Sequence, residues 1–179
     1  MPISRRDDLL RDSQRIGHGV IVGEPGWEAR LEANKRTFLS DFTSRGLLSI
    51  LYPTDMSPEE FVDALYLNAG VVPTAAERNA ALGEFGVTGV TIDSSARGRV
   101  LRRIIEDPTV DATQFNRAFV LMQYIGYLRR NPNDPQDTDH SGYDFWLKKL
   151  DQFNGDFVKA EMVRAFLISI EYRSGFGNP

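Results

Sequence analysis

The side chains in this sequence that are best suited to chemistry lie in a short polar loop in the last third of the chain. Asp137, Asp139 and Ser141 place oxygen-bearing side chains at alternate positions, and a glycine and Tyr143 follow them. In a calcium-binding loop, oxygen ligands recur at alternate positions, a glycine allows a sharp turn, and a backbone carbonyl comes next. The spacing therefore indicates a calcium site with four candidate ligands: Asp137, Asp139, Ser141 and Tyr143.

The same loop also fits a purely structural role. A complete calcium loop supplies a bidentate glutamate at its twelfth position, and Lys148 occupies that position here. Asp134 or Asp144 would have to contribute the missing oxygen. Aspartate and serine are also the residues that form polar turns and cap helices. We therefore favour a turn that caps a helix beginning near Gly142, and calcium binding is the alternative.

No other group of residues forms a recognisable catalytic arrangement. His18 and His140 are far apart, cysteine is absent, and no Ser/His/Asp order is convincing. The Gly-His-Gly stretch at residues 17–19 lacks the rest of a phosphate-binding fingerprint. The sequence thus predicts a noncatalytic protein with no catalytic residues and, calcium aside, no cofactor. An enzyme stays open as an alternative, because distant residues can converge in a fold.

Length and composition limit the class of protein. A chain of 179 residues suffices for one domain or two small subdomains. With 41% hydrophobic and 26% charged residues, its composition is that of an ordinary folded protein, and a net charge of -4 argues against a general nucleic-acid binder. No apolar run approaches the roughly 20 residues that span a bilayer. The first residues contain no apolar signal-peptide segment, which taken alone favours the cytoplasm.

Helices must position the polar loop. Ser57 and Thr74 begin capping boxes closed by Glu60 and Glu77, and residues 86–93 alternate like a strand but have no partner strand, so we expect an ordered loop there. Apolar residues at helical spacing predict helices at about residues 4–16, 25–45, 57–70, 74–85, 94–105 and 111–130, with two more after residue 142.

Two of these helices carry further expectations. The helix at 111–130 is predicted to be central, and five of its residues to be buried: Phe115, Ala118, Phe119, Met122 and Ile125. Its apolar stripe is wide enough that we also expect partial burial of Val120, Tyr124 and Tyr127. The helix at 94–105, capped by Ser94 or Ser95, presents four arginines on its polar face: Arg97, Arg99, Arg102 and Arg103. Solvated charge is the favoured role of this face, because no aromatic residues interleave with the arginines to stack on bases.

The helical segments show weak internal similarity. Residues 61–64 align with 115–118, residues 82–85 with 150–153, and residues 100–105 with 162–167. We therefore expect an all-α, compact bundle of about seven to eight helices, made of two divergent three-helix repeats behind N-terminal helices. The expected divisions are an N-terminal helical segment at 1–55, a degenerate repeat at 56–110 and a helical module at 111–179.

Four segments resemble a known family. They are Phe-Asn-Arg-Ala-Phe at 115–119, Gly-Tyr-Leu-Arg-Arg-Asn-Pro at 126–132, Asp-His-Ser-Gly-Tyr-Asp-Phe-Trp at 139–146, and Ala-Glu-Met-Val-Arg-Ala-Phe-Leu at 160–167 followed by Glu-Tyr-Arg. Together they resemble the bacterial domain of unknown function 4214 family over residues 111–177, with a degraded second copy at 57–107.

The resemblance implies a function without catalysis. That family is similar to the helical domains of phycobilisome linker proteins and typically occurs in large secreted or surface proteins of bacteria. The chain is accordingly expected to be a structural or interaction module of a secreted or envelope-associated protein, with a protein or a surface polysaccharide as partner. The alternatives are a calcium-assisted adhesion or carbohydrate-binding module, and a catalytic or accessory domain of a hydrolase.

Overall fold

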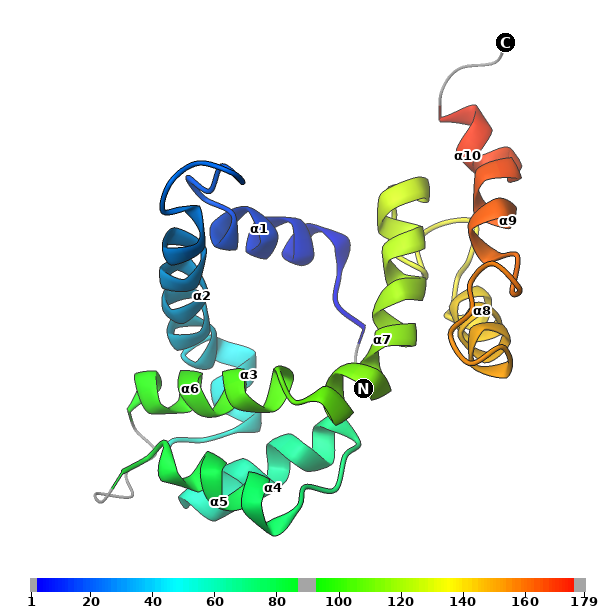
Figure 1. Cartoon of the computed structure of the whole chain (residues 1–179). Coiled ribbons are helices and arrows are strands. Elements are labelled where there is room, and N and C mark those ends of the chain that lie inside the picture. The colour runs from blue at the N-terminus through cyan, green and yellow to red at the C-terminus, as the bar shows by residue number, and fades with distance from the viewer. Residues whose placement is uncertain (1–2, 87–92, 176–179) are drawn as a thin grey trace. The chain divides into compact units, whose positions relative to one another are not determined.

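The computed structural model describes residues 3–86 and 93–175, and every regular element among them is a helix (Figure 1). The prediction of an all-α fold is confirmed, and eight of the described helices have seven or more residues, close to the expected seven to eight. The loop expected at 86–93 lies, except for its two end residues, outside the described residues. The helices are α1 Arg6–Ile16, α2 Trp27–Thr43, α3 Gly46–Leu51, α4 Pro58–Ala69, α5 Ala75–Gly83, α6 Ser94–Ile105, α7 Pro108–Gln123, α8 Ser141–Gln152, α9 Met162–Ile168 and α10 Ile170–Ser174.

The described chain divides into two compact units. Unit 1 comprises residues 8–113, and unit 2 comprises residues 3–7 and 114–175, so the division falls within α7. Each unit has its own cluster of buried hydrophobic residues. The two units are therefore described separately below.

Local capping fixes the helices of unit 1. The hydroxyl of Ser57 accepts from the Glu60 amide while the Glu60 carboxylate accepts from the Ser57 amide, and Thr74 and Glu77 make the same reciprocal pair. Gly70 ends α4 with φ of 72°, a conformation that glycine adopts without a steric penalty. Both capping boxes predicted from the sequence are confirmed.

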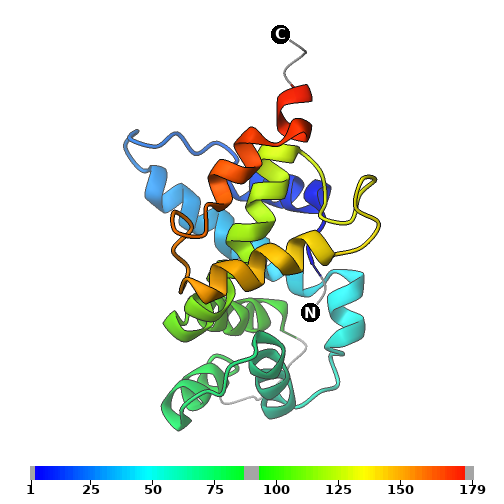
Figure 2. The same cartoon turned by 90° about the vertical axis from the view of Figure 1, so that its right-hand side faces the viewer.

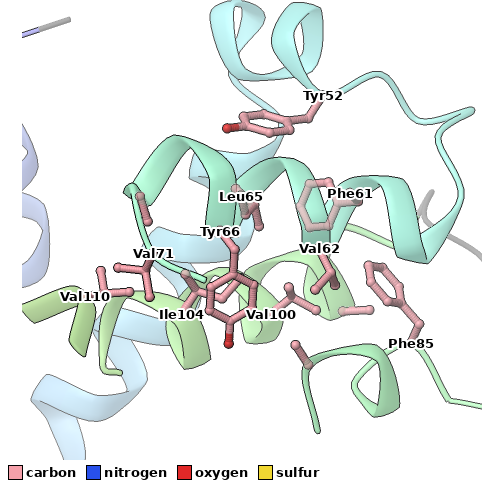
Figure 3. Close-up of a cluster of buried hydrophobic side chains, with 13 residues drawn as sticks. Tyr52, Phe61, Val62, Leu65, Tyr66, Val71, Phe85, Val100, Ile104 and Val110 are labelled. Carbon is pink, nitrogen blue, oxygen red and sulfur yellow. The ribbon is translucent and has the colours of Figure 1, made fainter. Parts of the chain in front are cut away.

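The core of unit 1 lies between α4, α5 and α6 (Figure 3). Phe61, Val62 and Val100 are completely buried, and the ring of Phe61 packs edge to face on those of Tyr52 and Phe85. Burial of such side chains stabilises a fold by about 1.5–3 kcal/mol each. Cluster members supplied by α4 thus carry most of the aromatic contacts that hold this unit together.

Arg97 is part of this core, contrary to the prediction of a solvated face. Its side chain is 2% exposed, its guanidinium donates to the Tyr52 carbonyl at the end of α3, and it lies 4.3 Å from the Phe61 ring centroid. A cation near helix C-terminal carbonyls and above an aromatic face is stabilised by both. Burial nevertheless lowers the pKa of Arg97.

Two predicted helix boundaries in unit 1 were also wrong. The helix expected at 25–45 stops at Thr43, and a further short helix, α3, which was not predicted, begins at Gly46. The N-cap of α6 is Asp93, whose carboxylate accepts from the Ser95 amide, in place of Ser94 or Ser95. Aspartate competes well with serine at this position because its charged oxygen also suits the positive end of the helix dipole.

Unit 2 is formed by the second half of α7, by α8, α9 and α10, and by a π-helical turn at Tyr124–Leu128 that follows α7 (Figures 1 and 2). Its buried cluster includes Val120 and Tyr124 from this continuous helix, Leu150 from α8 and Phe166 from α9. The ring of Tyr124 packs edge to face on Phe166 at 5.2 Å between centroids. Long-range packing between α7, α8 and α9 therefore builds the second core.

The buried face of the helix at 111–130 agrees with the prediction only in part, because Val120 and Tyr124 are buried as expected while other residues are not. Ile125 is buried and Phe119 is half-buried, but Phe115 is 53% and Met122 is 48% exposed, and Ala118 is exposed as well. Apolar residues occupy nearly every side of this helix, so spacing alone does not select a face. The π-helical turn adds a residue to the turn and changes which side chains point inward.

No helix among the described residues combines the length and the apolar character that crossing a membrane requires.

Candidate functional site

Unit 2 has a shallow cup of about 270 Å³ that combines aromatic rings with charged groups. We refer to it as the cup. Its walls come from the π-helical turn, the polar loop, α8, α9 and α10. The lining residues are Tyr124, Leu128, Arg130, Asp137, Gly142, Trp146, Ala165, Phe166, Ser169 and Glu171.

The backbone after the π-helical turn aims Arg130 into the cup. Arg129 adopts a left-handed conformation with φ of 57° and ends the helix, so the chain turns sharply before Arg130. Asn131, which is buried, then accepts from the Arg6 amide at 2.6 Å and donates to Asp134 at 2.8 Å. These bonds hold the start of the polar loop in one place.

Arg130 binds two carboxylates at once. Its Nε lies 2.5 Å from Oε1 of Glu171, and its Nη2 lies 2.7 Å from Oδ2 of Asp137. Burial disfavours the charged guanidinium, but the bonds to the two carboxylates outweigh it, and the pKa of Arg130 is raised. Ser169 helps by capping α10, which fixes Glu171 in the first turn of that helix.

Tyr124 lines the cup, and its hydroxyl lies beside Gly142 of α8. A Cβ at Gly142 would lie 2.7 Å from this hydroxyl and 3.6 Å from Oδ2 of Asp137, so only glycine leaves room there. Burial raises the pKa of Tyr124 to about 12, and the charge of Asp137 acts in the same direction. The phenol therefore stays protonated at neutral pH and is a hydrogen-bond donor.

The structure places the four predicted calcium ligands in different roles. Asp137 pairs with Arg130, and an oxygen of Asp139 accepts from the Ser141 amide at 2.9 Å. Ser141 and Tyr143 lie inside α8, and the Tyr143 hydroxyl donates to the Arg117 carbonyl at 3.0 Å. Among the described residues, no three histidine, cysteine or acidic side chains gather as metal ligands would.

The arrangement is suited to binding. Trp146 offers a half-buried ring in the cup and packs 5.6 Å from the buried ring of Phe166 between centroids. The donors of Arg130 are already used on Glu171, Asp137 and the backbone carbonyls of the next two residues. The carboxylates of Asp137 and Glu171 are both bonded to Arg130, so the most strongly charged groups of the cup are paired with one another.

Sequence reasoning missed the pairing at the centre of the cup. From the sequence, neither Arg130 nor Glu171 was assigned a role of its own. The single available signal was their presence in the segments that carry the family resemblance. Periodicity does not reveal a pair separated by 41 residues.

Comparisons of this chain with protein-family models, with curated proteins and with solved structures found no match.

Proposed function

We propose that this chain is a noncatalytic structural or interaction module of a larger bacterial secreted or envelope-associated protein. The observation that carries the proposal is the bonding of Arg130 to both Asp137 and Glu171. Arg130 spends its donors on these two carboxylates and on two backbone carbonyls, so the group joins segments of the chain to one another. Such a bonded group supports a structural role for the polar part of the cup.

The sequence resemblance supports the same proposal. The segments at 126–132 and 171–173, which contribute to the likeness with the domain of unknown function 4214 family, contain Arg130 and Glu171. The two units also share a local arrangement: Val62 and Tyr66 in unit 1, and Val120 and Tyr124 in unit 2, are buried valine and tyrosine four residues apart. The proposal includes an internal repeat in which Val62 and Tyr66 align with Val120 and Tyr124. This alignment replaces the one between residues 61–64 and 115–118.

The proposal is tested by cosedimentation of the purified chain with isolated bacterial cell envelopes. We expect saturable binding that is lost after protease treatment of the envelopes if the partner is a protein, or after periodate oxidation if it is a polysaccharide. No covalent change of the envelope material should accompany binding. Absence of saturable binding, or release of sugars or peptides in proportion to the amount of chain added, would contradict the proposal.

Carbohydrate binding at the cup is a second candidate, favoured by the half-buried Trp146 ring in its lining. Sugars bind through apolar faces that pack on aromatic rings and through hydroxyls that meet charged or polar groups. Trp146→Ala would then abolish periodate-sensitive binding, whereas Phe153→Ala, at an exposed ring of unit 2 outside the cup lining, would leave it unchanged. Equal loss in both variants would argue against a carbohydrate site in the cup.

A calcium-assisted form of this adhesion role would use Asp137, Asp139, Ser141 and the Tyr143 carbonyl. Calcium would have to displace Arg130 from Asp137, which opposes binding because the departing guanidinium leaves Glu171 as its only carboxylate partner. Calorimetric titration with calcium decides the matter. Heat of binding together with a raised Tm would support the metal site. The absence of both changes would exclude it.

A further inference from the structure

Unit 1 contains a groove whose walls are rich in arginine. It has a volume of about 650 Å³ and lies where α2, α6 and the end of α5 meet. We call it the arginine groove. Six residues line it: Arg36, Glu84, Arg99, Arg102, Arg103 and Glu106. A groove of this size accommodates a ligand of several side chains.

The charges in the groove are unevenly compensated. Arg99 and Arg103 share one carboxylate, that of Glu84, with Nε of Arg99 at 3.2 Å from Oε2 and Nη2 of Arg103 at 2.7 Å from Oε1. The side chain of Arg36, which is exposed, makes no ion pair or hydrogen bond within residues 3–86 and 93–175. Three arginines thus face one carboxylate in this part of the groove, which leaves an excess of positive charge.

The rest of the groove has the opposite balance. Arg102 pairs with Glu32 at 2.7 Å and with Glu106 at 3.0 Å, so two carboxylates serve a single guanidinium. A dense anion such as pyrophosphate would be repelled by these glutamates. A peptide, by contrast, offers backbone N–H donors to the carboxylates and acidic side chains to the arginines.

The intramolecular contacts already show which chemistry the arginines accept. Glu84 occupies donors of Arg99 and Arg103, while Nη1 of each makes no hydrogen bond within the described residues. Guanidinium groups bind carboxylates through several parallel N–H bonds, and arginine is enriched where proteins recognise acidic motifs. A ligand carboxylate can therefore add to the groove without displacing Glu84.

We infer that the arginine groove binds an acidic peptide segment of a protein partner, with Arg36, Arg99 and Arg103 as the carboxylate-binding residues. This inference rests on the proposed interaction role and names the class of partner.

The experiment is fluorescence anisotropy with a labelled ten-residue peptide of alternating glutamate and glycine, at low salt. Arg36→Gln should weaken binding by about five- to tenfold, as expected for loss of one charge pair at a surface site, and added salt should weaken binding further. Arg36 has no described partner, so this variant should fold normally, which circular dichroism would verify.

Two further variants make the test specific. Glu84→Gln frees Arg99 and Arg103 and should strengthen binding, a direction that damage to the fold would not produce. Arg164→Gln removes the same charge from an exposed arginine of unit 2 and should leave the affinity unchanged. Equal weakening by Arg36→Gln and Arg164→Gln, no binding of the peptide, or binding of tripolyphosphate in its place would overturn the inference.

The result is separable from that for the proposed function. If the groove inference alone fails, the Arg36→Gln variant still sediments with envelopes as the unaltered chain does. If the proposed function fails, neither protein sediments with them.

Discussion

Arg130 and Glu171 lie 41 residues apart in the chain, yet the Nε of Arg130 is 2.5 Å from Oε1 of Glu171. The same guanidinium holds Asp137 of the polar loop. One side chain thus joins the end of the π-helical turn, the polar loop and α10, and it adds to the packing of Tyr127 on Tyr172 between the first and the last of these segments. The side chains are 13% exposed for Arg130 and 22% for Glu171, so water screens the pair only in part.

Removal of Arg130 should therefore destabilise the fold strongly. Arg130→Met leaves two partly buried carboxylates without their cation, and we expect the free energy of unfolding to fall by about 2–3 kcal/mol. Urea denaturation followed by circular dichroism measures this change. Arg164→Met, at a side chain that is 76% exposed, is the matched control and should change stability by less than about 0.5 kcal/mol. Similar losses in both variants would show that Arg130 is an ordinary surface arginine.

Gly98 should be irreplaceable for a steric reason. A Cβ at this position would lie 3.0 Å from the Ser40 backbone nitrogen and 3.2 Å from the Leu39 carbonyl carbon, so α2 would have to move away from α6. Gly98→Ala should cost about 1–3 kcal/mol despite the better helix propensity of alanine. Gly83→Ala, with no atom within 4 Å of its Cβ, is expected to be neutral or to gain up to about 1 kcal/mol. Thermal denaturation should give Gly98→Ala a lower midpoint than Gly83→Ala. A lower midpoint for Gly83→Ala would refute the prediction.

Tyr66 and Tyr143 are both buried but should respond differently to loss of the hydroxyl. The Tyr143 hydroxyl donates to the Arg117 carbonyl, whereas the Tyr66 hydroxyl has no hydrogen-bond partner in the described part of the chain. Tyr143→Phe should cost about 1 kcal/mol or more, and Tyr66→Phe should be neutral or stabilising, since it removes a polar atom that burial leaves unpaired. Chemical denaturation of both variants compares the two costs directly. A larger loss for Tyr66→Phe would reveal a partner for its hydroxyl.

Tyr124 predicts how stability depends on alkaline pH. Its pKa is raised to about 12 by burial, from an ordinary value of 10.0. Below pH 10 the phenol is protonated in both the folded and the unfolded chain. As pH rises from 10 to 12, the unfolded chain loses this proton more readily, so the folded state loses stability in that window.

The comparison with Tyr124→Phe isolates this effect. The variant should lose less stability than the unaltered chain between pH 10 and pH 12, and its absorbance titration near 295 nm should lack one late-ionising tyrosine. Because Tyr66 and Tyr143 also have raised pKa values, the difference between the two proteins is the informative quantity. Identical pH profiles would show that Tyr124 is not desolvated.

The predictions from sequence succeeded where the cause was local. The capping boxes at Ser57 and Thr74 depend on contacts three residues apart, and both are present in the structure. The buried face of α7 was predicted correctly only in part because Phe115 and Met122 are as apolar as Val120, so only the neighbouring elements decide which of them is covered. Arg97 was misplaced for a similar reason, since its charge suggests exposure and only the end of α3 and the Phe61 ring make its burial tolerable.

The sequence by itself determined that the chain is all-α and where most helices begin, and it singled out the polar loop around Asp137. These features follow from periodicity and from hydrogen bonds between near neighbours. Only the tertiary structure decided that Arg130 meets Asp137 and Glu171, that Gly142 leaves room for the Tyr124 hydroxyl, and that Arg36 joins three arginines of α6 in one groove. Such contacts depend on which helix faces pack together. Packing is governed by the total apolar surface that the helices bury, and neighbours in the sequence do not determine it.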